Sequence, residues 1–134
     1  MAILGFGKKK DTRHVDEGLA SLHGKSEAEL VEFWKQRLVL ISQIPVETAR
    51  VGALTPQLRE LSRIESQDER TRLTRARIQA YAQLSPEQRD IIMAARKKAW
   101  DVDPGVLEKD QKIVDELMPA MDPSVRASYP TPKS

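Results

Sequence analysis

The sequence predicts an all-α fold, a small bundle of four to five short helices with flexible N- and C-terminal tails. Two observations favour this class. Polar residues that prefer the first turn of a helix recur along the chain, and apolar residues follow them at spacings of three and four. In addition, no segment alternates apolar and polar residues over the length of a strand, and no Asn-Gly or Asp-Gly hairpin turn occurs.

Five helix starts are predicted from these polar residues. Ser26 with Glu29 and Ser85 with Gln88 each form a capping box, in which two backbone N–H groups are bound reciprocally. Proline also favours the first helical position, because its missing N–H would be unpaired there in any case. Ser85 directly precedes Pro86, and the other three starts have the same pattern of a polar residue before proline. These starts are Thr55-Pro56, Asp103-Pro104 and Asp122-Pro123.

The apolar residues after each start indicate which face of each helix is buried. The stripe after Ser26 is the longest, and Val31 and Leu40 widen it, so we expect this helix to be the most buried. Residues 56–84 contain a wholly polar stretch from Ser66 to Arg72. They therefore form either one long helix or two, with Ser66 as the second cap. Pro119 is expected to end the helix that starts at Pro104.

With 134 residues, the chain is expected to hold one helical domain over residues 26–128. Residues 1–25 contain four glycines and little periodicity, which predicts a flexible segment. The tail 129–134 contains Pro130 and Pro132 and is expected to be disordered.

The string A-R-x-x-A occurs three times, at residues 49–53, 76–80 and 95–99. Two alanines four apart on one helix face allow close approach of a second helix. The recurrence is either a true repeat of short helices or a chance product of a composition rich in Ala and Arg. Arg77 in the second copy is expected either to lie along the edge of the core or to pair with an acid of the last helix.

The net charge is only +2, from 22 Lys and Arg against 20 Asp and Glu, but it is unevenly distributed. Residues 50–100 hold eleven basic and six acidic residues, a net charge of +5. Residues 101–122 hold seven acidic residues and two lysines, a net charge of −5. The simplest interpretation is that the basic middle of the chain packs beside the acidic last helix.

The first ten residues are candidates for a membrane anchor. An apolar tip followed by lysines can lie in the interface of an anionic membrane. This opening resembles the short anchor of the bacterial cell-division topological specificity factor, and the resemblance ends after about ten residues. The alternatives are a soluble basic tail and an apolar tip that packs into the bundle. The anchor candidates are Ile3, Leu4, Phe6, Lys8, Lys9 and Lys10.

No catalytic residue, metal ligand or cofactor site is predicted. The absence of Cys excludes disulfides, zinc–thiolate sites and a cysteine nucleophile. The two histidines, His14 and His23, lack the spacing of helical metal ligands, and no nucleophile elbow or glycine-rich phosphate loop occurs. The apolar residues of the opening precede its charges, the reverse of a secretory signal. We therefore expect a cytoplasmic protein, with the inner face of the membrane as an alternative.

These observations favour a non-enzymatic protein–protein interaction module, such as an adaptor, assembly factor or regulatory subunit. Its partner is another protein, and a homo-oligomer is an alternative. The first alternative function is a peripheral membrane protein anchored by residues 1–10. The second is an Arg-rich nucleic-acid binder, which is less favoured because aromatic residues make up only 4% of the chain and acids interrupt the basic run. The interface candidates are Trp100, Arg72, Arg75, Arg96, Lys97 and Lys98.

Overall fold

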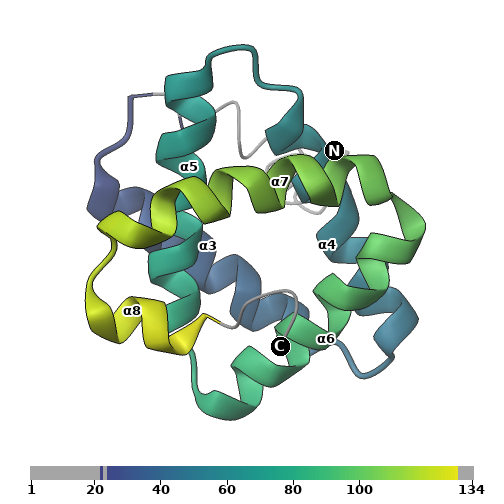
Figure 1. Cartoon of the computed structure of the whole chain (residues 1–134). Coiled ribbons are helices and arrows are strands. Elements are labelled where there is room, and N and C mark those ends of the chain that lie inside the picture. Colours follow the sequence, from purple (N-terminus) through teal and green to yellow (C-terminus); the bar gives the residue numbers. More distant parts are fainter. Residues whose placement is uncertain (1–21, 23, 130–134) are drawn as a thin grey trace, which may run out of the picture.

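The structure, a computed structural model, describes residues 22 and 24–129, which form an all-α bundle (Figure 1). This confirms the predicted fold class, and no strand occurs among the residues described. In the part of the chain that the structure describes, five helices have 14 to 17 residues and a sixth, α8, has six. A 3-10 turn, η1, spans Met118–Ala120. The α-helices are α3 (Glu27–Ser42), α4 (Glu47–Ser62), α5 (Gln67–Ala82), α6 (Pro86–Val102), α7 (Pro104–Leu117) and α8 (Pro123–Ser128).

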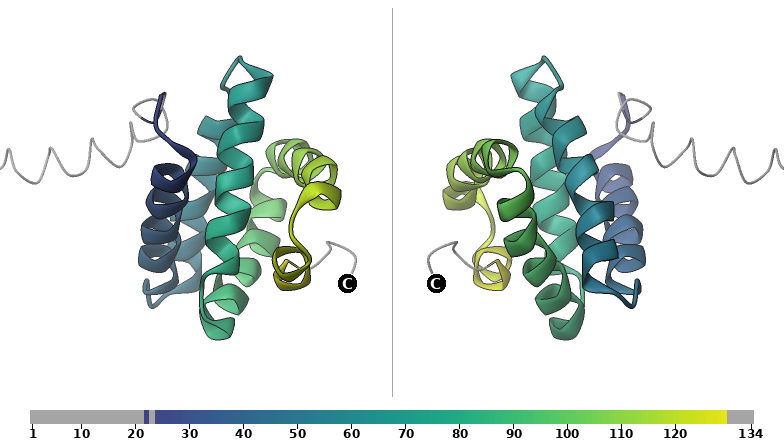
Figure 2. Two further views of the ribbon diagram at one scale, coloured as in Figure 1. Left: turned by 90° about the vertical axis from the view of Figure 1, so that its left-hand side faces the viewer. Right: turned by 90° about the vertical axis from the view of Figure 1, so that its right-hand side faces the viewer.

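Helix α5 occupies the centre of the bundle. It packs against α3 on one side and against α7 and α8 on the other (Figure 2). Helix α4 packs mainly against α6, and α7 crosses in front of α5 (Figure 1). This arrangement brings α7 into contact with both α5 and α6, and the candidate site lies where α7 meets these two helices.

Four of the five predicted helix starts are confirmed. The capping boxes at Ser26 and Ser85 both form, and the Asp103 carboxylate accepts a hydrogen bond of 3.3 Å from the Val106 N–H. Helix α8 begins at Pro123, although the Asp122 side chain makes no capping bond. Residues 56–84 contain parts of two helices, because α4 ends at Ser62 and the Ser66 hydroxyl caps α5.

The predicted start at Thr55-Pro56 is wrong. Helix α4 begins at Glu47 and continues through Pro56. The Thr55 hydroxyl does not cap a helix but donates a hydrogen bond of 2.8 Å to the Val51 carbonyl one turn earlier. Val51 and Leu54 are both buried, so the apolar face of α4 begins before the proline. Packing of that face outweighs the loss of one backbone hydrogen bond at Pro56.

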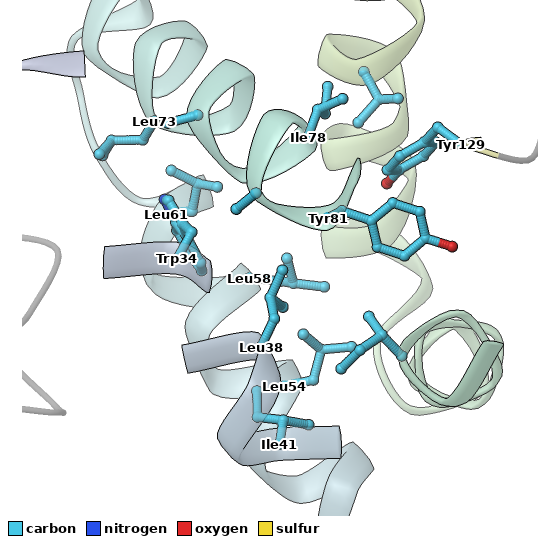
Figure 3. Packing of buried hydrophobic residues seen from close by; sticks show 14 of the residues in the cluster. Trp34, Leu38, Ile41, Leu54, Leu58, Leu61, Leu73, Ile78, Tyr81 and Tyr129 are labelled. Carbon is cyan, nitrogen blue, oxygen red and sulfur yellow. The ribbon is translucent and has the colours of Figure 1, made fainter. Parts of the chain in front are cut away.

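The expectation that the helix after Ser26 is the most buried is also wrong. Leu40 of α3 is 58% exposed, because α3 lies at the outside of the bundle (Figure 2). Helix α5 has neighbours on both sides and is the most buried helix, with Leu73, Ala76 and Ile78 completely inaccessible. Helices α3, α4 and α5 all contribute residues to this core, among them Trp34, Leu58 and Leu73 (Figure 3).

The folded region extends slightly beyond the predicted boundaries. Leu22, assigned to the flexible segment 1–25, and Tyr129, assigned to the tail 129–134, are both part of the buried core. Tyr129 follows α8, which packs on α5, and its ring meets the Tyr81 ring edge-on with centroids 5.0 Å apart. All six anchor candidates and both histidines lie outside the described residues, so their predictions stay predictions.

Candidate functional site

Two of the three A-R-x-x-A copies bring their arginines to the same carboxylate. Arg77 of α5 donates two hydrogen bonds to Asp110 of α7, 3.0 Å to Oδ1 and 2.7 Å to Oδ2. Arg96 of α6 donates to the same Oδ2 at 2.7 Å and to Gln111 Oε1 at 2.9 Å. We call these four residues, Arg77, Arg96, Asp110 and Gln111, the charged junction. It confirms the pairing of Arg77 with an acid of the helix that starts at Pro104.

The charged junction carries a net charge of +1 inside the protein. Arg77, Arg96 and Asp110 are 5%, 6% and 4% exposed. Burial alone would raise the pKa of Asp110, but the charges of Arg77 and Arg96 outweigh it and hold this pKa below its usual value. Burial alone would likewise lower the pKa of Arg77, but Asp110 outweighs it and the pKa is raised. Arg77 and Asp110 are therefore ionised at neutral pH. Because a guanidinium keeps its charge in proteins, two cations share one anion.

The first A-R-x-x-A copy has a different role. Arg50 donates a hydrogen bond of 2.6 Å to the Ile44 carbonyl, near the start of α4, and Ala49 is exposed. In the other two copies the alanines are fully buried and let the helices approach closely. The common role of the second and third copies is thus structural, because each directs one buried arginine to α7. Their alanines are Ala76, Ala80, Ala95 and Ala99.

A groove of about 540 Å³ opens beside the charged junction, between α6 and the end of α8. We call it the α6–α8 groove. Tyr81, Met93 and Tyr129 also line a small cavity of about 20 Å³ behind it, so these side chains separate the groove from the core. The apolar lining of the α6–α8 groove comes mainly from Tyr81, Met93, Ala94, Trp100 and Tyr129.

The charged side chains in the lining are predominantly basic. Arg89, Arg96 and Lys97 line the groove together with a single acid, Asp90. Arg89 is held in place by a hydrogen bond of 2.8 Å to the Leu84 carbonyl. The guanidinium carbon of Arg96 lies 5.9 Å from the centre of the Trp100 ring, within the range of a cation–π contact. The groove thus combines an aromatic wall with an excess of positive charge.

The Tyr81 hydroxyl completes the wall on the α5 side. It donates a hydrogen bond of 3.3 Å to the Arg89 carbonyl. Burial raises the pKa of this hydroxyl to about 12, so it remains protonated at neutral pH. Tyr81 therefore acts here as a neutral donor and an apolar surface.

The structure brings three of the six predicted interface residues together, Trp100, Arg96 and Lys97. Arg96 is buried in the charged junction and is not the exposed cation that was expected. Lys98 is exposed on α6 but does not line the groove. The other two residues pair within the bundle: Arg72 with Glu69 at 2.9 Å, and Arg75 with Glu27 at 3.6 Å.

Sequence reasoning missed Asp110 and Tyr129. The recurrence of A-R-x-x-A was the signal for the paired arginines, but nothing in the pattern indicated which acid they share. Tyr129 was assigned to the tail because prolines follow it at two of the next three positions. Its aromatic side chain at the end of the helix predicted to start at Pro123 was the available signal for burial.

Neither a metal-binding cluster nor a membrane-spanning helix is found in the described part of the chain. Within residues 22 and 24–129, no group of three or more His, Cys, Asp or Glu side chains could hold a metal ion. No helix in this part of the chain is long and apolar enough to span a membrane. Comparisons with models of protein families, with curated proteins and with solved structures found no match.

Proposed function

We propose that the protein is a cytoplasmic, non-enzymatic interaction module, and that a segment of a partner protein binds in the α6–α8 groove. In this role it would serve as an adaptor, assembly factor or regulatory subunit. The observation that carries the proposal is the set of residues that line the α6–α8 groove of about 540 Å³. Trp100, Tyr81 and Arg96 are among them. Trp, Tyr and Arg are the residue types that contribute most to binding at protein interfaces.

The frame around the groove supports this function. Arg96 is held by Asp110 and Gln111, so the distance between α6 and α7 is set by directional bonds. Tyr129 is held against Tyr81 of α5. A groove whose walls are already ordered loses less conformational entropy when a partner binds.

The nucleic-acid alternative gains no support from these contacts. Arg72 and Arg75 are paired with acids of the bundle, and Arg96 is buried. A nucleic-acid footprint requires clustered exposed cations. The membrane-anchor alternative depends on residues 1–10. Co-sedimentation of the full chain with anionic vesicles, compared with a chain lacking these residues, tests it separately.

The test of the proposed function is selection of peptides from a random library on the full-length protein. The variant Ala94→Trp fills the groove, and Ala28→Trp makes the same substitution at an exposed position of α3. We expect the wild-type protein and Ala28→Trp to enrich the same peptide pattern, and Ala94→Trp to lose it. The proposal is wrong if no pattern is enriched, or if both variants retain it.

A further inference from the structure

We infer that the α6–α8 groove recognises an acidic segment, in which Asp or Glu residues flank a large apolar side chain. This inference rests on the proposed function and specifies the chemistry of its partner. Its two grounds are the positive charge of the groove and the order of the side chains along α6.

The charge beneath the groove is incompletely neutralised. Asp110 is shared between Arg77 and Arg96, which leaves the buried charged junction with one positive charge in excess. An uncompensated charge in a low-dielectric interior favours a nearby anion. Arg96 reaches the groove, and its bonds to Asp110 and Gln111 use two of the five N–H donors of a guanidinium. A carboxylate in the groove would therefore lower the electrostatic free energy of the junction.

The charged residues in the walls of the groove increase its positive electrostatic potential. Arg89 and Lys97 line the groove against one acid, Asp90. Together with the junction, these groups give the site a net charge of +2. The surrounding surface is largely aromatic and aliphatic, so a bound carboxylate would interact with these cations at a reduced effective dielectric.

The order of residues along α6 gives the pattern of the partner. Arg89, Met93, Lys97 and Trp100 follow one another at spacings of four, four and three, so they share one helix face. The face spans about 16 Å from Arg89 to Trp100, at about 1.5 Å per residue. It presents a cation, an apolar side chain, a second cation and an aromatic ring. The complementary segment places acids opposite Arg89 and Lys97, and an apolar side chain between them.

The experiment uses a peptide obtained by the selection above and a second version in which every Asp and Glu is replaced by Asn and Gln. Binding to the full-length protein is measured at low and moderate salt for the wild type, Lys97→Glu and Lys112→Glu. Lys112 is exposed on α7 and does not line the groove, so its variant controls for net charge. We expect the acidic peptide to bind about tenfold more tightly than the neutral one, and Lys97→Glu to lose about tenfold in affinity. We expect Lys112→Glu to bind nearly as the wild type does.

The possible failures are distinguishable. If the selected peptides depend on Ala94 but lack acids, or if the neutral version binds equally well, the inference is wrong and the proposed function stands. If no peptide pattern is enriched, both are wrong. If double-stranded DNA displaces the acidic peptide at lower concentration than excess acidic peptide does, the groove is a general polyanion site and the inference is overturned.

Discussion

The two sides of α5 are built with different chemistry. On the side that faces α3, Leu30 and Trp34 are completely buried, and the buried contacts are apolar. Figure 3 shows Trp34 among these core residues. The ion pair between Arg75 and Glu27 on this side lies at the partly exposed edge of the interface. On the side that faces α7, Arg77 forms two hydrogen bonds with a buried carboxylate. Apolar contacts are non-directional and supply most of the folding free energy, whereas a buried ion pair is directional and gains little net stability after desolvation. We interpret the apolar side as the source of stability and the charged junction as the device that positions α6 and α7 around the groove.

The largest expected effect is on the apolar side. Trp34→Ala removes a fully buried indole from the hydrophobic core, and we expect it to lower the free energy of unfolding by about 3–5 kcal/mol. Urea denaturation followed by circular dichroism measures this. Leu40→Ala on the same helix is the control, because Leu40 is 58% exposed and should change stability by less than about 0.5 kcal/mol. Equal losses for the two variants would contradict the assignment of the core.

Removing only the anion of the charged junction should lower the free energy of unfolding almost as much. Asp110→Asn leaves Arg77 and Arg96 buried without a counter-charge, and we expect a loss of about 3 kcal/mol. Glu108→Gln, exposed on the same helix, is the matched control. The comparison becomes sharper with a triple variant, Arg77→Met, Arg96→Met and Asp110→Leu. We expect it to recover most of the stability but to lose binding in the groove. If the triple variant still binds like the wild type, the charged junction does not position the groove.

The same junction predicts a dependence on pH. The pKa of Asp110 is held below its usual value of 3.8, chiefly by Arg77 and Arg96, which outweigh the effect of burial. The folded state therefore binds this proton less readily than the unfolded state does. The resulting stability is fully present above about pH 4 and is lost as the pH falls through the lowered pKa. Urea midpoints measured between neutral pH and about pH 2.5 should fall more steeply for the wild type than for Asp110→Asn. Parallel curves would show that other carboxylates, such as Asp103 and Glu29, account for the acid sensitivity.

The sequence predicts features that depend on contacts between residues close together in the chain. It does not predict features that depend on contacts between distant residues. The starts of α3, α6 and α7 depend on hydrogen bonds between residues three apart, so a capping residue is sufficient evidence. The apolar residues after Ser26 likewise predicted that α3 buries one face, and Trp34 lies on that face. The charged junction joins residues 14 to 33 positions apart. Which acid meets the two arginines depends on how three helices cross, and no local pattern encodes that angle.

The sequence predicted the types of residue that line the groove, but it did not predict which individual residues come together there. Trp100 and Lys97 were interface candidates because of their chemistry and their place on the predicted helix. Arg96 has the same chemistry as Arg72, yet burial separates their roles. Tyr129 was missed because the prolines after it outweighed the evidence from its own side chain.

A smaller effect of opposite sign is expected at Pro56, on the apolar side. Proline inside α4 has no N–H to donate to the Gly52 carbonyl one turn earlier. Pro56 is exposed, so Pro56→Ala restores this bond without disturbing the core. We expect an increase in the free energy of unfolding of about 1–3 kcal/mol. A loss of stability instead would indicate that the proline sets a bend which the packing of α4 on α6 requires.

The smallest effect is expected one turn earlier, at Gly52. Glycine in a helix interior is less favourable than alanine by about 0.5–1 kcal/mol, because its backbone loses more freedom on folding. A methyl group at Gly52 would meet no atom within 4 Å beyond its chain neighbours and the backbone of its own helix, so Gly52→Ala should add about that amount of stability. The two positions share one hydrogen bond, and the double variant with Pro56→Ala measures their coupling. If the gains add, the local weakness of α4 is a matter of backbone propensity alone. If the gains do not add, the Gly52 carbonyl changes its position when residue 56 has no N–H to donate. The apolar side of α5 would then also depend on one directional hydrogen bond.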